Sequence, residues 1–482
     1  MLLFAFSSIE QYHAQLLEEK ITCCHAVEHY LSRISQHAHL NAFVEVYADE
    51  AMQQALALDQ KRKDGHSIGR LHGVVIALKD VICHKDHLVS ACSNILQNFA
   101  SVYSATAVQK LLDEEAIIIG RCNCDEFAMG STNENSAYGK VLNALDETRV
   151  PGGSSGGSAV AVQAGLCMLS LGSDTGGSVR QPADFCGIIG LKPTYGRISR
   201  YGLIAYASSF DQVGIFGNTI PDVAKVLEII SGADEFDSTV SSRVVPTYSA
   251  QLNTTKKFRF AYFAEALDHP AIDKEISTGI NTLIGQLKKD GHTVEAVKFD
   301  LLDHIVPAYY VLTTAEASSN LSRYDGVKYG YRTTEEGLEL TDFYKKTRSE
   351  GFGKEVKRRI MLGTFVLSAG YYDAYFTRAQ KVRRLVSVQI KKIFNEFDLI
   401  LLPTSPVTAF KAGEKINDPV AMYLADIYTV MANLVGIPAI SLPVFKHSNN
   451  MPFSVQVMAN HFDELTLLQI SSLIMERYRQ AI

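Results

Sequence analysis

The segment from Pro151 to Pro193 constrains this 482-residue chain more than any other, because two glycine–serine clusters there flank a run of small residues. Glycine loses more conformational freedom on folding than other residues do. Such a density therefore indicates backbone in unusual conformations or packed very close to a neighbour. The serines among these glycines are candidate nucleophiles: Ser154, Ser155, Ser158, Ser173 and Ser178. A serine nucleophile needs a base, and Lys79 is the candidate.

Composition places the chain among soluble globular proteins, with 47% hydrophobic and 20% charged residues. Its net charge is −6 and no run of five basic residues occurs, so we do not expect this chain alone to bind a nucleic-acid backbone extensively. A partner can still hold RNA. The eight cysteines are scattered and no secretory segment or membrane-length apolar stretch is evident, which favours a reducing, cytoplasmic location without a membrane.

Residues 1–70 are predicted to form a helical segment packed on a main domain over residues 71–482, with Ser8 and Thr22 as helix caps. From about residue 70, short apolar runs alternate with helical segments, which predicts one large α/β domain. The expected strands cover 74–78, 116–119, 166–171, 258–263, 399–402 and 455–458. The expected helices cover 105–112, 158–165, 271–289 and 372–396.

Lys79 follows the apolar run VVIAL, so it is predicted to lie at the carboxyl end of a buried strand. Ligands of open α/β sheets gather at that edge. Poor solvation there favours the uncharged amine and lowers the lysine pKa toward the working range. The alternative is a structural lysine paired with Asp80 or Asp125.

Ser178 ends the motif GSDTGGS, between a predicted strand and a helix that Pro182 is expected to open. This geometry directs successive backbone N–H groups toward one point. The amides of Thr175, Gly176 and Gly177 are therefore candidate donors for an oxyanion hole. The alternative is a loop that only binds anions.

The first cluster, GGSSG, fits the sequence pattern G-x-S-x-G of a nucleophile elbow. A polar loop precedes it, however, where an elbow needs a strand, so the elbow interpretation fails. No phosphate-binding G-x-x-x-x-G-K-[ST] motif can be placed anywhere. A hydroxyl can accept one hydrogen bond while it donates another, so Ser154 is predicted to relay a proton between Lys79 and Ser178.

These motifs, in this order, resemble the amidase signature family, with the core motif over residues 149–215. The resemblance implies a single α/β/α domain with a mixed, mostly parallel central sheet and helices on both faces. It implies a Ser–cis-Ser–Lys triad in which Lys79 is the base, Ser154 the relay and Ser178 the nucleophile.

Several stretches, among them DEFAMGST, SRYDG and GKEVKRRIMLG, resemble one branch of that family, the A subunits of bacterial glutamyl-tRNA(Gln) amidotransferases. This implies hydrolysis of glutamine and delivery of ammonia to a B subunit that amidates Glu-tRNA(Gln) with ATP and Mg²⁺. It also implies a small C subunit, tRNA bound mainly by the B subunit and no cofactor on this chain; Asp-tRNA(Asn) stays open as a second acceptor. The substrate-binding residues implied are Met129, Gly130, Tyr309, Arg358 and Asp426.

Three other functions stay open from the residues alone. A free-standing amidase would act on other small amides, and a silent scaffold subunit would not need the triad. A nitrilase-type cysteine enzyme would need a cysteine in a glycine loop, whereas Cys186 is interpreted as a small buried hydrophobe. A metal site is not expected, because Cys83, His84, His87, Cys92 and the Cys122–Cys124 pair fit no standard zinc spacing.

Overall fold

The computed structural model describes residues 4–414 and 425–479, and its centre is an 11-stranded sheet in the order β1-β3-β2-β4-β6-β5-β10-β11-β9-β7-β8. The strands are β1 (Phe43–Val46), β2 (Val75–Lys79), β3 (Ile117–Cys122), β4 (Leu169–Asp174), β5 (Ile189–Lys192), β6 (Gln212–Gly217), β7 (Arg259–Tyr262), β8 (Thr293–Ala296), β9 (Leu399–Pro403), β10 (Ala439–Lys446) and β11 (Pro452–Ala459).

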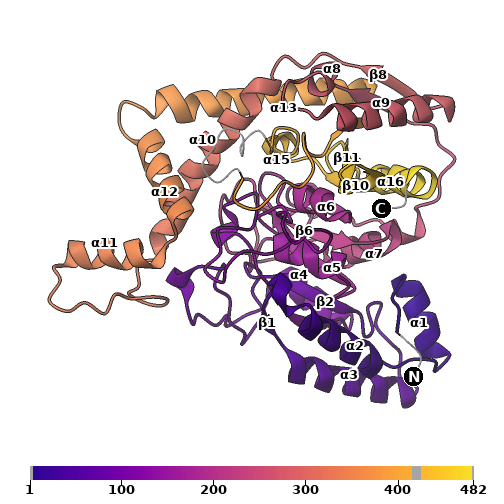
Figure 1. Cartoon of the computed structure of the whole chain (residues 1–482), viewed down its shortest axis with the longest axis horizontal. Coiled ribbons are helices and arrows are strands. Elements are labelled where there is room, and N and C mark those ends of the chain that lie inside the picture. Colours follow the sequence, from indigo (N-terminus) through magenta and orange to yellow (C-terminus); the bar gives the residue numbers. More distant parts are fainter. Residues whose placement is uncertain (1–3, 415–424, 480–482) are drawn as a thin grey trace.

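Helices surround this sheet, and α11 and α12 extend away from the main body (Figure 1). The helices are α1 (Ile9–Leu17), α2 (Cys23–Gln36), α3 (Ala48–Lys63), α4 (Thr106–Asp113), α5 (Gly156–Gln163), α6 (Arg180–Cys186), α7 (Ile220–Ile230), α8 (Ala264–Leu267), α9 (Lys274–Lys289), α10 (Leu302–Asn320), α11 (Leu340–Gly351), α12 (Lys354–Leu367), α13 (Arg378–Glu396), α15 (Val430–Val435) and α16 (Glu464–Tyr478). A π-helical turn over Asp373–Thr377 leads into α13.

The sheet separates helices on its two faces, as the register of β5 and β6 shows. Gly190 lies opposite Phe216, so the two residues share a face, and a Cβ at Gly190 would meet Ala183 of α6 at 2.5 Å. Gly217, the next residue along β6, would meet Val223 of α7 at 2.9 Å. Successive strand residues point to opposite faces, so α6 and α7 cover opposite sides of the sheet.

The α/β class and the mixed sheet are confirmed, but parallel pairs are not the majority. Among the described residues, β2–β3, β2–β4, β7–β8 and β7–β9 pair in parallel, whereas six pairings are antiparallel. The reason is local: β10 and β11 form a hairpin, and β5 and β6 turn back antiparallel beside β4.

The predicted caps Ser8 and Thr22 are confirmed: their hydroxyls accept from the amides of Gln11 and His25, respectively. The six predicted strands are found with shifted ends. Strands β1, β5, β6, β8 and β10 were not predicted; β1 lies in the otherwise helical N-terminal segment and pairs with β3 at the sheet edge. Helix α6 begins at Arg180, two residues before Pro182. No described helix combines the length and apolar character needed to cross a membrane.

Candidate active site

Lys79 is the last residue of β2 and its side chain is completely buried. Its Nζ donates to Ser154 Oγ over 2.7 Å and to Ser173 Oγ over 2.9 Å. Burial lowers the pKa of Lys79 below its usual 10.5, although the nearby Cys124 thiol and Asp125 carboxyl oppose that change. Neither predicted structural partner is paired with it: Asp80 binds Arg121 over 2.6 Å, and the Asp125 carboxyl accepts from the amides of Asn133 and Asn135 over 2.9 and 3.1 Å.

The peptide bond between Gly153 and Ser154 is cis. The Gly153 amide donates to Gln181 Oε1 over 2.9 Å, and the Asp125 amide donates to the Ser154 carbonyl over 3.1 Å. A Cβ on Gly153 would lie 2.2 Å from Asp125 Oδ2, so glycine is required there. This peptide is therefore held on both sides by buried polar groups.

Ser178 lies in the loop between β4 and α6, and it is 8% exposed. The Ser155 amide donates to the Ser178 carbonyl over 3.3 Å, which joins this loop to the Ser154 segment. No hydrogen bond connects the Ser154 and Ser178 hydroxyls within the described residues. The structure thus brings Lys79 and Ser154 into direct contact and places Ser178 on the adjoining loop.

Asp174 organises the start of this loop from a fully buried position. Its Oδ1 accepts from the Gly177 amide over 3.0 Å and its Oδ2 accepts from the Val179 amide over 3.2 Å. Arg180 grips the same carboxylate through Nε and Nη2, over 3.0 and 2.9 Å. Burial alone would raise the pKa of Asp174, but the Arg180 charge outweighs it and lowers that pKa to about 2.

The three predicted oxyanion donors therefore differ in their surroundings. The Gly177 amide is already engaged by Asp174, whereas the amides of Thr175 and Gly176 have no acceptor within the described part of the chain. The Thr175 hydroxyl donates to Asp211 Oδ1 over 2.7 Å, which anchors the loop from its other side.

Tyr309 and Thr429 press against the glycines of this loop. A Cβ on Gly176 would lie 2.3 Å from Tyr309 Oη, and one on Gly177 would lie 2.3 Å from Thr429 Oγ1. The Thr429 hydroxyl also donates to the Gly176 carbonyl over 2.6 Å. Tyr309 is thus in contact with the candidate nucleophile loop, and its burial raises its pKa well above 10.

Asp426 lies in the turn that precedes α15 and belongs to the same cluster. Its Oδ2 accepts from Ser131 Oγ and from Tyr310 Oη, each over 3.0 Å, and its carbonyl accepts from the Thr429 amide over 3.1 Å. Burial raises the pKa of Asp426 to about 6, although these hydroxyls and the Arg359 charge act against it.

The two neighbouring arginines of α12 occupy different environments. Arg358 is 40% exposed and contacts Glu355 over 2.6 Å, whereas Arg359 is only 6% exposed. Arg359 Nη1 donates to Tyr206 Oη over 2.9 Å, and its guanidinium lies 5.4 Å from the Tyr310 ring centroid. Because Tyr310 in turn binds Asp426, Arg359 reaches the buried cluster.

Met129 and Gly130 lie in the loop that carries Ser131. Met129 is completely buried, and a Cβ on Gly130 would lie 2.3 Å from Asp125 Cγ, so a larger residue there would displace the carboxylate. Gln181 Nε2 donates to the Ser131 carbonyl over 3.1 Å, while its Oε1 binds the Gly153 amide. A single side chain therefore joins this loop to the cis peptide.

Four groups at the site were not foreseen: Ser173 as a second partner of Lys79, the Asp174–Arg180 pair, Tyr310 and Arg359. The sequence indicates Ser173 only as a candidate nucleophile. Its position just after the end of a predicted strand, one residue before Asp174, was the only signal that it lies near Lys79. For Arg359, the helical spacing of four residues from Glu355 was the signal.

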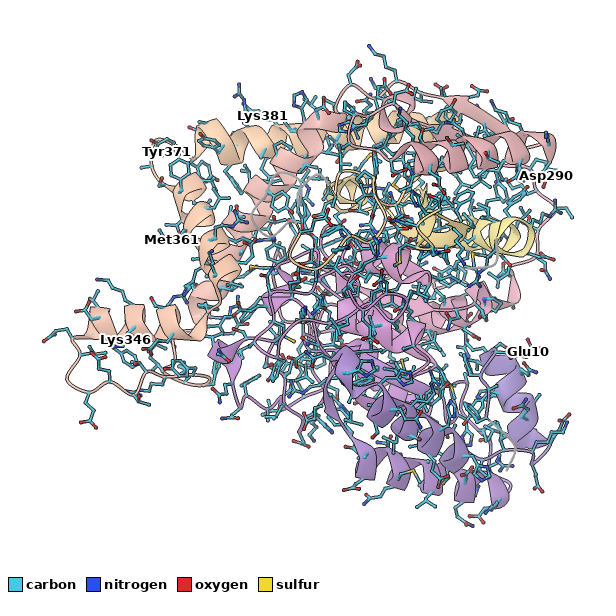
Figure 2. The ribbon with its side chains drawn as sticks, viewed as in Figure 1. Glu10, Asp290, Lys346, Met361, Tyr371 and Lys381 are labelled. Carbon is cyan, nitrogen blue, oxygen red and sulfur yellow. The ribbon has the colours of Figure 1, made fainter. Side chains whose placement is uncertain are left out.

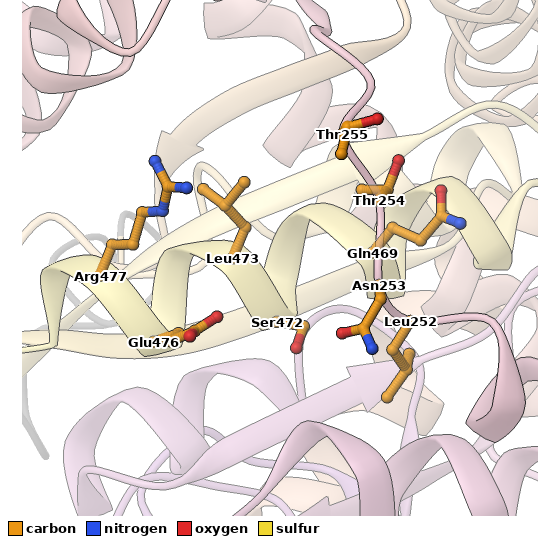
Figure 3. A pocket seen from close by; sticks show the side chains of 9 residues that line it. All are labelled: Leu252, Asn253, Thr254, Thr255, Gln469, Ser472, Leu473, Glu476 and Arg477. Carbon is orange, nitrogen blue, oxygen red and sulfur yellow. The ribbon is translucent and has the colours of Figure 1, made fainter.

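No group of three or more metal-ligating side chains occurs among the described residues. The closest cysteines, Cys92 and Cys124, have their sulfurs 3.5 Å apart in a buried position. A surface pocket of about 360 Å³ between residues 252–255 and α16 is lined by side chains such as Gln469 and Arg477 and contains none of the candidate catalytic residues (Figure 3).

Comparison with known proteins places the whole chain among the amidases. The profile of the family described as Amidase matches residues 25–468. The A subunit of glutamyl-tRNA(Gln) amidotransferase from Chlorobium limicola is 47% identical over 472 residues, covering 98% of this chain and 99% of that protein. The protein of the same name from Koribacter versatilis is 47% identical over 465 residues, covering 96% and 97%.

Two solved structures also resemble this chain over nearly its full length. The A subunit of glutamyl-tRNA(Gln) amidotransferase from Thermotoga maritima has a TM-score of 0.79 and 39% identity, with 99% of this chain and 96% of that chain covered. The peptide amidase of Stenotrophomonas maltophilia has a TM-score of 0.82 and 26% identity, with coverage of 99% and 98%. The chain therefore belongs to the amidase family.

Proposed function

We propose that this chain is the glutaminase subunit of a tRNA-dependent amidotransferase. The observation that carries the proposal is the buried contact of Lys79 Nζ with Ser154 Oγ over 2.7 Å, beside the loop of Ser178. The full-length similarity to proteins named as A subunits of glutamyl-tRNA(Gln) amidotransferases supports the choice of substrate.

In the proposed reaction, uncharged Lys79 takes the proton of Ser154 as Ser154 takes that of Ser178. The Ser178 oxygen then attacks the side-chain amide carbon of glutamine, and the Thr175 and Gly176 amides stabilise the resulting oxyanion. Gly177 contributes by holding the loop on Asp174. The relay returns its proton to the departing ammonia, and water cleaves the ester to release glutamate.

Recognition of the amino acid requires a cation for the α-carboxylate and an anion for the α-ammonium. We assign these roles to Arg359 and Asp426, with Tyr309 and the loop of Met129 and Gly130 as walls of the pocket. Arg359 Nη2 has no acceptor within the described residues, so its N–H groups are available to a carboxylate oxygen of the substrate. Arg358, implied by resemblance, is more exposed and is assigned to the rim.

The ammonia would pass to a B subunit that uses ATP and Mg²⁺ to convert Glu-tRNA(Gln) to Gln-tRNA(Gln) in the cytoplasm. A C subunit would brace the contact of the two larger subunits in a heterotrimer. Binding of tRNA chiefly by the partner accords with the net charge of −6 on this chain.

The decisive test is Gln-tRNA(Gln) formation by the reconstituted three-subunit enzyme with either glutamine or ammonium chloride as nitrogen donor. Ser178→Ala should abolish glutamine-dependent amidation and leave ammonium-dependent amidation intact, because only ammonia production uses Ser178. Full glutamine-dependent activity in Ser178→Ala, or none with either donor in the unmodified enzyme, would contradict the proposal.

A free-standing amidase is the second candidate, favoured by the TM-score of 0.82 to peptide amidase. It predicts faster turnover of plain aliphatic amides than of glutamine and no requirement for partner subunits. Steady-state rates with acetamide, butyramide and glutamine, measured on the purified chain and on the complex, distinguish the two functions.

A further inference from the structure

Two cysteine thiols that the proposed reaction does not use lie side by side near Lys79. Cys92 and Cys124 are completely buried, in an interior densely filled with side chains (Figure 2). Their sulfur atoms are 3.5 Å apart, and the Cys124 amide donates a hydrogen bond to Cys92 Sγ over 3.2 Å. Disulfide-bonded sulfurs lie about 2 Å apart, so a movement of roughly 1.5 Å would bring these two into bonding distance.

Backbone contacts join each cysteine to a segment that carries a catalytic group. The Cys92 amide donates to Asp80 Oδ2 over 2.8 Å, and Asp80 directly follows the proposed base. Cys124 directly precedes Asp125, whose amide donates to the Ser154 carbonyl over 3.1 Å. A covalent bond between the two sulfurs would therefore pull on the segment that follows the base and on the segment that holds the relay serine.

An amine that can act as a base lies close to this pair. A thiol attacks an oxidant as the thiolate, and burial raises the pKa of the Cys92 thiol well above its usual value, so the pair needs a base. After burial itself, the Cys124 thiol is the neighbour with the largest effect on the pKa of Lys79, followed by the Asp125 carboxyl and the Cys92 thiol. The amine that is proposed to accept the proton of Ser154 can therefore also accept that of Cys124.

We propose that Cys92 and Cys124 form a reversible disulfide when hydrogen peroxide reaches them, and that this bond stops the amidase reaction. The loss of activity rests on the proposed function, in which Lys79 is the base. Disulfides in a reducing cytoplasm are usually transient and sense the redox state, which fits two free thiols held in contact. A displacement of about 1 Å in catalytic groups lowers a rate by roughly 100-fold, so the bond should remove nearly all activity.

The reaction balances with peroxide as the only oxidant. The Cys124 sulfur, once its proton has passed to Lys79, attacks one peroxide oxygen; an S–O bond forms, the O–O bond breaks, and a sulfenic acid results. The hydroxide released takes the proton back from Lys79 and leaves as water. The Cys92 sulfur then attacks the sulfenic sulfur, so that an S–S bond forms as the S–O bond breaks, and the second hydroxide leaves as water with the Cys92 proton. The two thiols lose two electrons and peroxide gains them.

The direct test is peptide mapping of the full-length chain after treatment with hydrogen peroxide, with the remaining thiols blocked before digestion. We expect two peptides joined through Cys92 and Cys124 and separated by dithiothreitol. Trypsin leaves Cys122 and Cys124 on one peptide, so fragment ions must assign the bond. A bond through Cys122 or Cys167 instead, or no joined peptides, would overturn the inference.

Ammonia release from glutamine, measured in parallel on the three-subunit complex, tests the effect of the bond. Peroxide should lower the rate by roughly 100-fold, and dithiothreitol should restore it. Cys124→Ser and Cys124→Ala should lose activity roughly tenfold more slowly, because no sulfenic acid can form there, whereas Cys186→Ser should behave as the unmodified enzyme. Cys186 is the matched control because it is also buried, and its thiol donates to the Pro151 carbonyl over 3.4 Å.

The possible failures can be told apart. Inactivation at the same rate in both Cys124 variants, or inactivation that dithiothreitol does not reverse, would overturn the inference. A mapped bond between Cys92 and Cys124 in an enzyme of full activity would overturn the effect on the reaction. No glutamine hydrolysis by the reduced complex would contradict the proposed function instead, and peptide mapping would still decide whether the disulfide forms.

Discussion

Lys79 Nζ lies 2.7 Å from Ser154 Oγ, and both side chains are completely buried. The second contact of the amine is another hydroxyl, that of Ser173, so its hydrogen-bonding neighbours are hydroxyl groups and not carboxylates. An ammonium in this place would have no carboxylate bound to it to compensate for lost hydration. The arrangement therefore favours the uncharged amine, the form that a base requires.

We predict that kcat/KM for glutamine hydrolysis rises with pH through the lowered pKa of Lys79, since the amine acts only when unprotonated. Lys79→Arg should lower kcat by roughly 10²- to 10⁴-fold at every pH, because arginine stays charged. Ammonia release measured between pH 5 and 10 gives both results.

Lys192 is the matched control for that profile. It is also completely buried and burial lowers its pKa to about 7, but its Nζ donates to the Pro193 carbonyl over 2.7 Å. Lys192→Met should keep the ascending limb of the profile. A limb that disappears in Lys192→Met would assign the titration to Lys192 and contradict the role of Lys79.

Asp426 should control the affinity for glutamine. Its pKa of about 6 is raised from 3.8, so the carboxylate that binds the α-ammonium is lost as the pH falls through 6, and KM should rise there. Asp426→Asn should raise KM by roughly 10- to 100-fold at neutral pH, as expected for loss of a charged hydrogen bond, with a smaller effect on kcat. A fall in kcat with unchanged KM would contradict this assignment.

Gly176→Ala should impair catalysis, because the new methyl group would lie 2.3 Å from Tyr309 Oη and 2.4 Å from its Cζ and displace the loop of Ser178. We expect kcat to fall by roughly 100-fold, as small misplacements of catalytic groups do. Gly285→Ala in α9 has open space around its Cβ and should leave activity unchanged while stabilising the helix by up to about 1 kcal/mol. Equal activity in the two variants would show that the loop tolerates the movement.

Loss of the Arg180 side chain should destabilise the protein. Arg180→Met leaves Asp174 buried without its cation, which costs about 3–5 kcal/mol in the free energy of unfolding. Because the folded pKa of Asp174, about 2, lies below its unfolded value, the carboxylate stabilises the protein at neutral pH. That contribution is lost as the pH falls from about 4 toward 2. Urea unfolding at pH 7 and pH 3 should show a smaller difference between variant and unmodified chain at pH 3.

The sequence was sufficient to predict strands with a continuous apolar run and residues that belong to a motif. It was not sufficient for strands and residues whose place depends on contacts with distant parts of the chain. Lys79 was placed correctly because a continuous apolar run precedes it. Strand β10 was not predicted, because it is specified by its pairing with the distant strand β5 and with β11. Arg358 and Arg359 are adjacent in sequence, and only the packing of α12 against Tyr206 and Tyr310 determines which is buried.

The most direct test of the central claim is mass spectrometry of the enzyme quenched during glutamine turnover, followed by peptide mapping of the covalent intermediate. We predict a glutamyl ester on Ser178, which accumulates when Lys79 and Ser154 are intact and disappears in Ser178→Ala. An ester on Ser154, Ser155 or Ser173 instead, or turnover without any ester in an enzyme that still releases ammonia, would contradict the account.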